Sequence, residues 1–168
     1  ERLGRLGASE FYGGETGARI AEDVEQNGGY LRLSDFEQYR PIVQEQALSA
    51  TYRGLGISAV KGPCAGPTVL EILNILQQFD IAAMGYGTVD SLHTIIEAVK
   101  LSAVDRFSFM GDPAVYGFPI DVLAQPEYAV NRAMNIDPSM ATVFSAGDPW
   151  SFTENDKPRD FPVPAGAS

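Results

Sequence analysis

The residues that could act as a thiol nucleophile and its base are Cys64 and His93, the one cysteine and the one histidine of the chain. A cysteine attacks an acyl group as a thiolate when a nearby histidine takes its proton. Cys64 lies in a loop predicted by Gly62, Pro63 and Gly66, whereas His93 lies in a helical pattern far along the chain. Because no spacing brings the two together, we interpret Cys64 as an incidental or packed residue.

A metal site could be built on the helix that contains His93, because Glu97 follows one turn later on the same face. Two ligands are too few, and any others would have to be scattered carboxylates. A single cysteine also excludes an internal disulfide and a multi-cysteine zinc site. We therefore expect no metal, no cofactor, and a hydrogen-bonded structural role for His93.

Two further patterns have both a catalytic and a structural interpretation. The glycine-rich residues 13–17 precede a predicted helix and could bind a phosphate, but the Lys-Ser/Thr ending of a nucleotide loop is missing, so we predict a tight turn. Asp105 and Arg106, followed by Gly111-Asp112-Pro113, resemble an acid–base pair. Since an arginine keeps its proton at any working pH, we interpret them as a helix-end ion pair and a turn. These residues alone assign no catalytic role.

The elements that must position these side chains are mostly helical. Apolar residues at helical spacing predict helices over residues 16–27, 67–79, 88–110 and 126–134. Two of these helices carry apolar stripes, Val69, Ile72, Leu73 and Leu76 in one, and Leu92, Ile96, Val99 and Ala103 in the other. We expect the stripes to bury against one another and against a partner, so that the isolated chain exposes apolar surface.

A β-hairpin is predicted where the periodicity changes to alternation, over residues 45–60, with a break at Gly54-Leu55-Gly56. Ser34 and Glu37 fit a capping box, which predicts a single helical turn there. The pattern as a whole indicates an α+β fold.

Composition limits the classes of protein and of partner. With 168 residues, 45% of them hydrophobic, the chain can form one compact domain, and we expect a single segment over residues 1–168. Five prolines and little periodicity predict that residues 136–168 form an extended or mobile tail. A net charge of −10 without a basic patch excludes nucleic acid and anionic membranes as partners. No apolar run is long enough for a membrane span.

Short motifs occur in a defined order between residues 10 and 113. They are Glu10-Phe11-Tyr12-Gly13-Gly14, Asn27-Gly28-Gly29-Tyr30-Leu31, Thr51-Tyr52-Arg53-Gly54, Ile72-Leu73-Asn74-Ile75-Leu76, Glu97-Ala98-Val99-Lys100-Leu101 and Gly111-Asp112-Pro113. In this order and spacing they resemble the C-terminal part of the large subunit of the γ-glutamyltransferase family. One motif departs from that family, which usually has a proline run and Ser-Ser-Gly-Gly where this chain has Gly62-Pro63-Cys64-Ala65-Gly66-Pro67.

The resemblance implies a role in an N-terminal-nucleophile (Ntn) hydrolase with a four-layer αββα sandwich. Such an enzyme transfers the γ-glutamyl group of glutathione-like amides to water or an amine. The nucleophile would be a threonine that opens a separate small subunit, its α-amino group acting as the base, so that the active protein is a heterodimer or larger. The resemblance carries no catalytic residue onto this chain. Family habit implies export to the periplasm or the outside of the cell.

The resemblance also implies a processing junction at or near Ser168, because family precursors cut themselves immediately before the nucleophilic threonine. Pro158, Pro162 and Pro164 disfavour regular structure there and leave the chain accessible to cleavage. The chain opens without an initiator methionine, so we expect a processed product or a fragment. Two alternatives stay open: an Ntn-type acylase or amidohydrolase that acts on another amide, and a non-catalytic interaction subunit.

Overall fold

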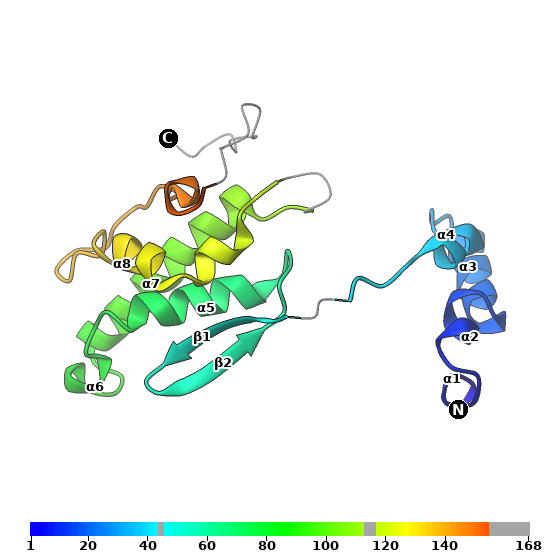
Figure 1. Cartoon of the computed structure of the whole chain (residues 1–168), viewed down its shortest axis with the longest axis horizontal. Helices are drawn as coiled ribbons and strands as arrows, with labels where there is room; N and C mark the ends of the chain where they lie inside the picture. Colours follow the sequence, from blue (N-terminus) through cyan, green and yellow to red (C-terminus); the bar gives the residue numbers. More distant parts are fainter. Residues whose placement is uncertain (44–45, 113–116, 155–168) are drawn as a thin grey trace. The chain divides into compact units, whose positions relative to one another are not determined.

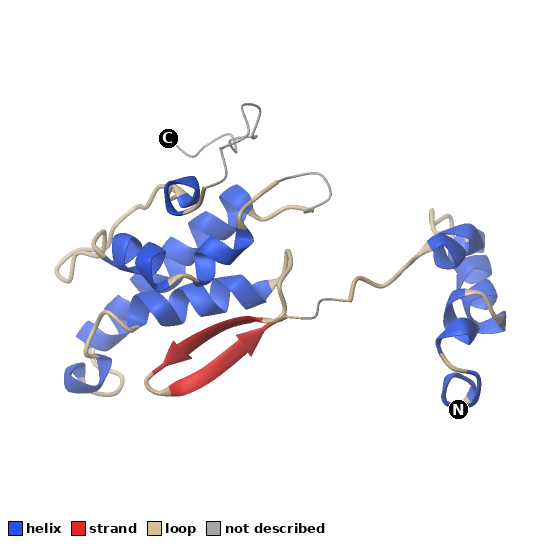
Figure 2. Ribbon diagram, in the orientation of Figure 1, coloured by secondary structure: helices blue, strands red, loops and turns tan. Residues whose placement is uncertain are grey.

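The computed structural model describes residues 1–43, 46–112 and 117–154. The chain divides into two compact units, Glu1–Val43 and Gln44–Ser168. Helices dominate the described residues of both units, and the strands found there form one hairpin (Figures 1 and 2). The α+β class is therefore confirmed. The single segment over residues 1–168 stays a prediction.

The first unit consists of four helices, α1 (Arg2–Leu6), α2 (Ala8–Tyr12), α3 (Glu15–Gln26) and α4 (Leu33–Gln38). Helix α3 confirms the helix predicted over residues 16–27. Phe11 contacts Phe36 edge-on, with ring centroids 5.6 Å apart. The capping box predicted at Ser34 is wrong, because α4 begins one residue earlier. The Asp35 carboxylate accepts the backbone N–H of Arg32 (2.7 Å) and closes the helix start instead.

The second unit contains the predicted hairpin. Strands β1 (Leu48–Tyr52) and β2 (Leu55–Ala59) are antiparallel, with Leu48 opposite Ala59 and Tyr52 opposite Leu55. Arg53 and Gly54 form the turn with φ angles of 50° and 81°. Positive φ at both central residues matches the twist of the strands, which explains why a glycine stands at the second position.

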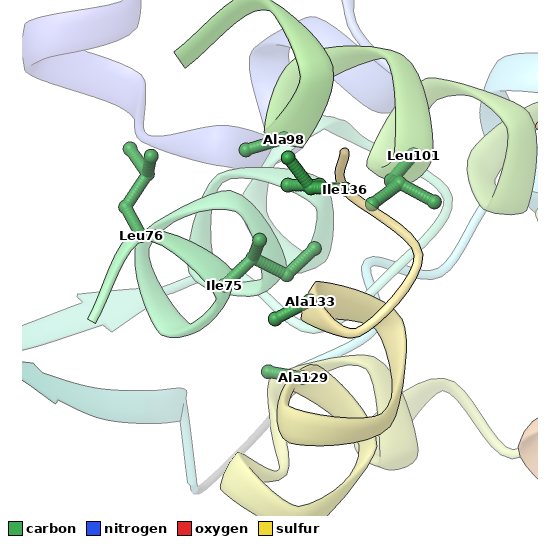
Figure 3. Close-up of a cluster of buried hydrophobic side chains, with 7 residues drawn as sticks. All are labelled: Ile75, Leu76, Ala98, Leu101, Ala129, Ala133 and Ile136. Carbon is green, nitrogen blue, oxygen red and sulfur yellow. The ribbon is translucent and has the colours of Figure 1, made fainter. Parts of the chain in front are cut away.

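Helix α5 (Ala65–Leu76) is the centre of this unit and packs against α7 (Val89–Phe109), α8 (Pro126–Ala133), the 3₁₀-helix η1 (Ile120–Ala124) and the hairpin. The short α6 (Ile81–Met84) connects α5 to α7, and a second 3₁₀-helix, η2, covers Pro149–Phe152. These bounds confirm the predicted helices 67–79, 88–110 and 126–134 to within a few residues. Figure 3 shows the core cluster between α5, α7 and α8, which comprises Ile75, Leu76, Ala98, Leu101, Ala129, Ala133 and Ile136.

The predicted α5 stripe is confirmed in part, because Leu76 is buried and Ile72 packs against the core cluster, whereas Val69 is 45% exposed. The predicted α7 stripe does not bury against α5 within this chain, and its burial against a partner stays a prediction. Leu92, Ile96 and Val99 are 50%, 55% and 43% exposed, and Phe107 farther along α7 is 79% exposed. The buried side of α7 carries Ser91, Thr94, Glu97, Ala98, Leu101, Ser102, Asp105 and Phe109, and that of α5 carries Pro67, Leu70, Glu71, Asn74, Ile75 and Leu76. On the buried side of α7, Asp105 and Glu97 find hydrogen-bond partners inside the fold. The exposed residues Leu92, Ile96, Val99 and Phe107 are called the α7 apolar stripe below.

The region predicted as an extended or mobile tail is largely without regular structure as far as Glu154, but it is packed. Trp150 is buried and contacts Phe109 edge-on, at 5.3 Å between ring centroids. Among the described residues, no helix has both the length and the apolar character needed to cross a lipid bilayer.

Candidate functional site

A buried polar cluster of the second unit is centred on Asp105, in the last third of α7. Its carboxylate is fully buried and accepts hydrogen bonds from Tyr128 Oη (2.6 Å), Arg132 Nη2 (3.1 Å) and the Gly147 amide (2.8 Å). Arg132 Nε lies 2.9 Å from the second Asp105 oxygen and completes the ion pair. A buried carboxylate with several donors and a paired cation is stable in its ionised form.

Helix α8 supplies two of these partners because Tyr128 and Arg132 are four residues apart and face α7 together. Burial, followed by the negative charge of Asp105, raises the pKa of Tyr128 well above its usual value. Tyr128 is therefore held in its protonated form and donates its hydroxyl hydrogen to Asp105. Its hydroxyl is held as a structural group and is not available as a base.

Gly147 brings the main chain of the C-terminal region into the same cluster. A Cβ atom at this position would lie 2.3 Å from Tyr128 Oη and 2.9 Å from Arg132 Cδ. Arg132 also donates to the carbonyl oxygen of Ser145 (2.9 Å). Only a residue without a side chain lets the backbone approach Asp105 this closely.

Helix α7 also holds the residues that precede Gly147, through two more polar contacts. His93 Nε2 lies 2.8 Å from the carbonyl oxygen of Asp137, and Glu97 accepts the amide of Thr142 (2.9 Å). Lys100 Nζ pairs with Glu97 (2.6 Å). Burial opposes ionisation of Glu97, but hydrogen bonds from Lys100 and Thr142 outweigh it and lower its pKa. Residues 137–147, called the anchored segment below, thus run along α7 on side-chain-to-backbone contacts.

The thiol–imidazole pair is not assembled. Cys64 Sγ contacts the carbonyl oxygen of Val60 (3.5 Å), whereas His93 is occupied by Asp137. The structural interpretation of His93 is confirmed. Among the described residues no group of three or more His, Cys, Asp or Glu side chains is placed to hold a metal ion.

The glycine-rich turn is likewise occupied from within the chain. Glu10 accepts the amide of Thr16 (3.2 Å) and its hydroxyl (3.1 Å), and pairs with Arg2 (2.8 Å). A carboxylate of the protein itself therefore sits at the start of α3, where a phosphate would have to bind. The predicted tight turn is the better description of residues 13–17.

The predicted ion pair at the end of α7 is wrong in its partner. Asp105 pairs with Arg132 of α8, while Arg106 contacts the Thr68 hydroxyl (3.4 Å). Sequence reasoning missed Glu71, Tyr128 and Arg132 altogether. A charged residue inside an apolar run, such as Glu71 between Leu70 and Ile72, was the available signal. Ser168, the predicted processing junction, lies outside the described residues.

Comparison with known proteins places this arrangement in a family context. The family model described as Gamma-glutamyltranspeptidase matches residues 1–163. The glutathione hydrolase proenzyme of Escherichia coli (strain K12) is 33% identical over 82% of this chain and 24% of its own length, and the acylase ACY 1 proenzyme of Pseudomonas sp. (strain SE83) is 32% identical over 84% and 25%. The chain thus spans about a quarter of the length of these curated relatives.

Two solved structures are similar in fold. The crystal structure of Helicobacter pylori gamma-glutamyltranspeptidase matches with a TM-score of 0.75 and 30% identity, over 84% of this chain and 40% of that one. The cephalosporin acylase from Bacillus halodurans matches with a TM-score of 0.75 and 31% identity, over 88% and 27%.

Proposed function

The chain belongs to the γ-glutamyltranspeptidase family, and from this membership we propose that it forms the C-terminal part of the large subunit of an Ntn hydrolase that transfers γ-glutamyl groups to water or amines. The observation that carries the proposal is the continuous family match over residues 1–163. Glutathione-like amides are the proposed donors. The proposed location is the periplasm or the outside of the cell.

Catalysis is proposed to lie on a partner small subunit that begins with threonine. The chain's own polar groups support this division of labour, because Asp105, Glu97 and His93 are all committed to holding the anchored segment. A threonine at a chain start needs no such group, since its own α-amino group can take the hydroxyl proton. Amide donors of the partner would then stabilise the oxyanion of the acyl transfer.

The proposed partner also accounts for the apolar surface of the second unit. The α7 apolar stripe is contiguous at helical spacing, and a stripe of this kind on a long helix is usually covered by another element. A hairpin of two strands is too small to form a sandwich alone. We propose that the rest of the family-length protein, including the small subunit, covers the stripe and completes the αββα layers.

A second candidate function is hydrolysis of a different amide by an acylase of the same family. The observation in its favour is that an acylase proenzyme and a glutathione hydrolase proenzyme match this chain almost equally well, at 32% and 33% identity. The loop around Cys64, which departs from the usual proline run, is where this chain differs from the transpeptidase pattern. The two candidates share the nucleophile and differ in the acyl group that is recognised.

The test is to express the family-length precursor from the parent gene and to assay it with a γ-glutamyl anilide and with an acyl-lactam amide. We expect turnover of the γ-glutamyl anilide and two polypeptides by intact mass, the second beginning with threonine immediately or within a few residues after Ser168. Faster turnover of the acyl-lactam would favour the acylase. A single uncut chain that is active would overturn the subunit assignment and the junction. Replacing that threonine by alanine is the control, since it should leave the precursor uncut and inactive.

A further inference from the structure

Glu71 is a buried ionisable group that the proposed catalysis does not use. It lies on α5, is fully buried, and faces the Asp105 cluster. Neither carboxyl oxygen of Glu71 accepts a hydrogen bond from any donor within the described ranges. The carboxyl group that acts on Glu71 electrostatically is that of Asp105, which raises the pKa of Glu71 after burial does. Two carboxyl groups can share a hydrogen bond only if one of them carries a proton.

The surrounding donors decide which of the two carries it. Asp105 accepts from Tyr128, Arg132 and the Gly147 amide, all of which stabilise an ionised carboxylate. Glu71 has no such donor, and Arg132 is the cation next to both groups. Ionising Glu71 as well would place two negative charges beside one positive charge in a site closed to water.

We propose that Glu71 stays protonated in the folded chain and that its O–H donates a hydrogen bond to Asp105, so that loss of this proton releases the anchored segment at Gly147. The proton makes the contact between α5 and α7 attractive. Without it, two carboxylates repel each other at the point where Gly147 is held. The cluster is then a pH-sensitive lock on the anchored segment.

The charged groups around Glu71 support this assignment. Burial, and then the negative charge of Asp105, raises the pKa of Glu71 well above its usual value, while Arg132 opposes the rise. Tyr128 of α8 stays neutral, as described above. On η1, Asp121 is more than half exposed and pairs with Lys61. On β1, Tyr52 lies under the guanidinium of Arg53. Among the described residues, Arg132 is the cation that acts on the pKa of Glu71.

The sign of the effect follows from proton linkage. The unfolded chain loses the Glu71 proton near the ordinary glutamate pKa, while the folded chain retains it to higher pH. The stabilisation is therefore complete at acidic pH and declines as the pH rises towards the folded pKa. Over that interval this one group lowers the folding equilibrium constant up to tenfold per pH unit.

The first experiment compares urea unfolding of the full chain and of Glu71→Gln between pH 5 and pH 9. A glutamine has the shape of the protonated acid and can donate to Asp105, so the variant should match the wild type within a few-fold at pH 5. At pH 8 its folding constant should exceed that of the wild type by at least tenfold. Glu127→Gln, which removes an exposed carboxylate from the first turn of α8, should follow the wild type at every pH. Equal pH slopes for Glu71→Gln and the wild type would overturn the proposal.

A second experiment needs no variant that folds. With glutamate side chains labelled with ¹³C, the NMR spectrum of the wild type should contain one carboxyl carbon that still has the shift of a protonated acid at pH 7. Hydrogen exchange at the Gly147 amide should accelerate at alkaline pH beyond the intrinsic dependence on hydroxide. If every glutamate carbon titrates below pH 6, Glu71 is ionised in the fold and the lock does not exist.

Discussion

At Gly147 the anchored segment has no room for any side chain. We predict that Gly147→Ala destabilises the second unit by about 1–3 kcal/mol, because its methyl group must displace Tyr128 or Arg132 from Asp105. Urea unfolding would measure the loss. Gly62→Ala is the matched control, since a Cβ there meets nothing within 4 Å. Equal stability of the two variants would show that the cluster relaxes around the methyl group.

Cys64 should be dispensable for catalysis. Its thiol contacts the Val60 carbonyl oxygen, and a serine hydroxyl can make the same contact. We predict that Cys64→Ser in the family-length precursor leaves kcat/KM within a few-fold of the wild type. A loss of about 10³-fold, the size expected for a missing nucleophile, would contradict the threonine mechanism.

Single residues also show what the sequence could and could not predict about the site. The structural role of His93 was predictable, because a single histidine without further His or Cys ligands nearby cannot complete a metal site. The pairing of Asp105 with Arg132 was not, since it joins residues far apart in sequence through the packing of α7 on α8. Local patterns favoured Arg106, the neighbour in sequence.

Among the elements, the positions of the helices could be predicted from hydrophobic periodicity. The face that each helix buries could not. The apolar stripe of α7 was predicted to bury against α5 and a partner, and within this chain it is exposed. A polar residue can replace an apolar one inside the fold when its partner arrives from another element, as Asp105 and Glu97 illustrate. The hydrophobic pattern of one helix gives no information about a hydrogen-bond partner that another element supplies.

This orientation predicts unequal effects of truncating two α7 residues. Leu101 is fully buried in the core cluster, so Leu101→Ala should cost about 2–5 kcal/mol. Ile96 is 55% exposed, so Ile96→Ala in the chain alone should cost less than about 1 kcal/mol. Urea unfolding of both variants is the measurement. Equal losses would mean that the stripe is covered within this chain.

The two ends of the anchored segment should loosen at opposite ends of the pH range. The Thr142 amide should lose protection in acid, whereas the Gly147 amide should lose protection at alkaline pH. The pKa of Glu97 is lowered, so its contribution to stability is present above the unfolded glutamate pKa and is lost as the pH falls through the folded value. We predict faster hydrogen exchange at the Thr142 amide on acidification below about pH 4.5, after correction for intrinsic rates. Glu97→Gln should remove this dependence. A Thr142 amide that stays equally protected in acid would contradict it.

At the scale of the whole molecule, the α7 apolar stripe connects the chain to the rest of the family-length protein. We predict that Phe107→Glu leaves the unfolding free energy of the chain within about 0.5 kcal/mol, because Phe107 is 79% exposed. The same substitution should weaken assembly with the remainder of the protein by at least about tenfold, since it would bury a charge. Co-purification yield and titration would measure this.

Asn131→Glu is the control for that experiment, because it adds the same charge at an exposed polar position of α8. If both substitutions leave assembly unchanged, the partner does not cover the stripe. If Phe107→Glu unfolds the chain, the stripe is packed within the chain itself.

The anchored segment is held through its main chain at Asp137, Thr142 and Gly147, which are five residues apart, and by the side chain of Phe144, which packs against the core cluster. Its exposed side chains between these points are therefore weakly specified, whereas its length is fixed by the helix beside it. Substitutions at exposed positions such as Met140 and Val143 should be tolerated. A one-residue deletion between two contacts would shift every later amide out of phase with Glu97 or Asp105. In this segment, we expect related sequences to vary freely at exposed positions, and we expect selection to remove insertions and deletions.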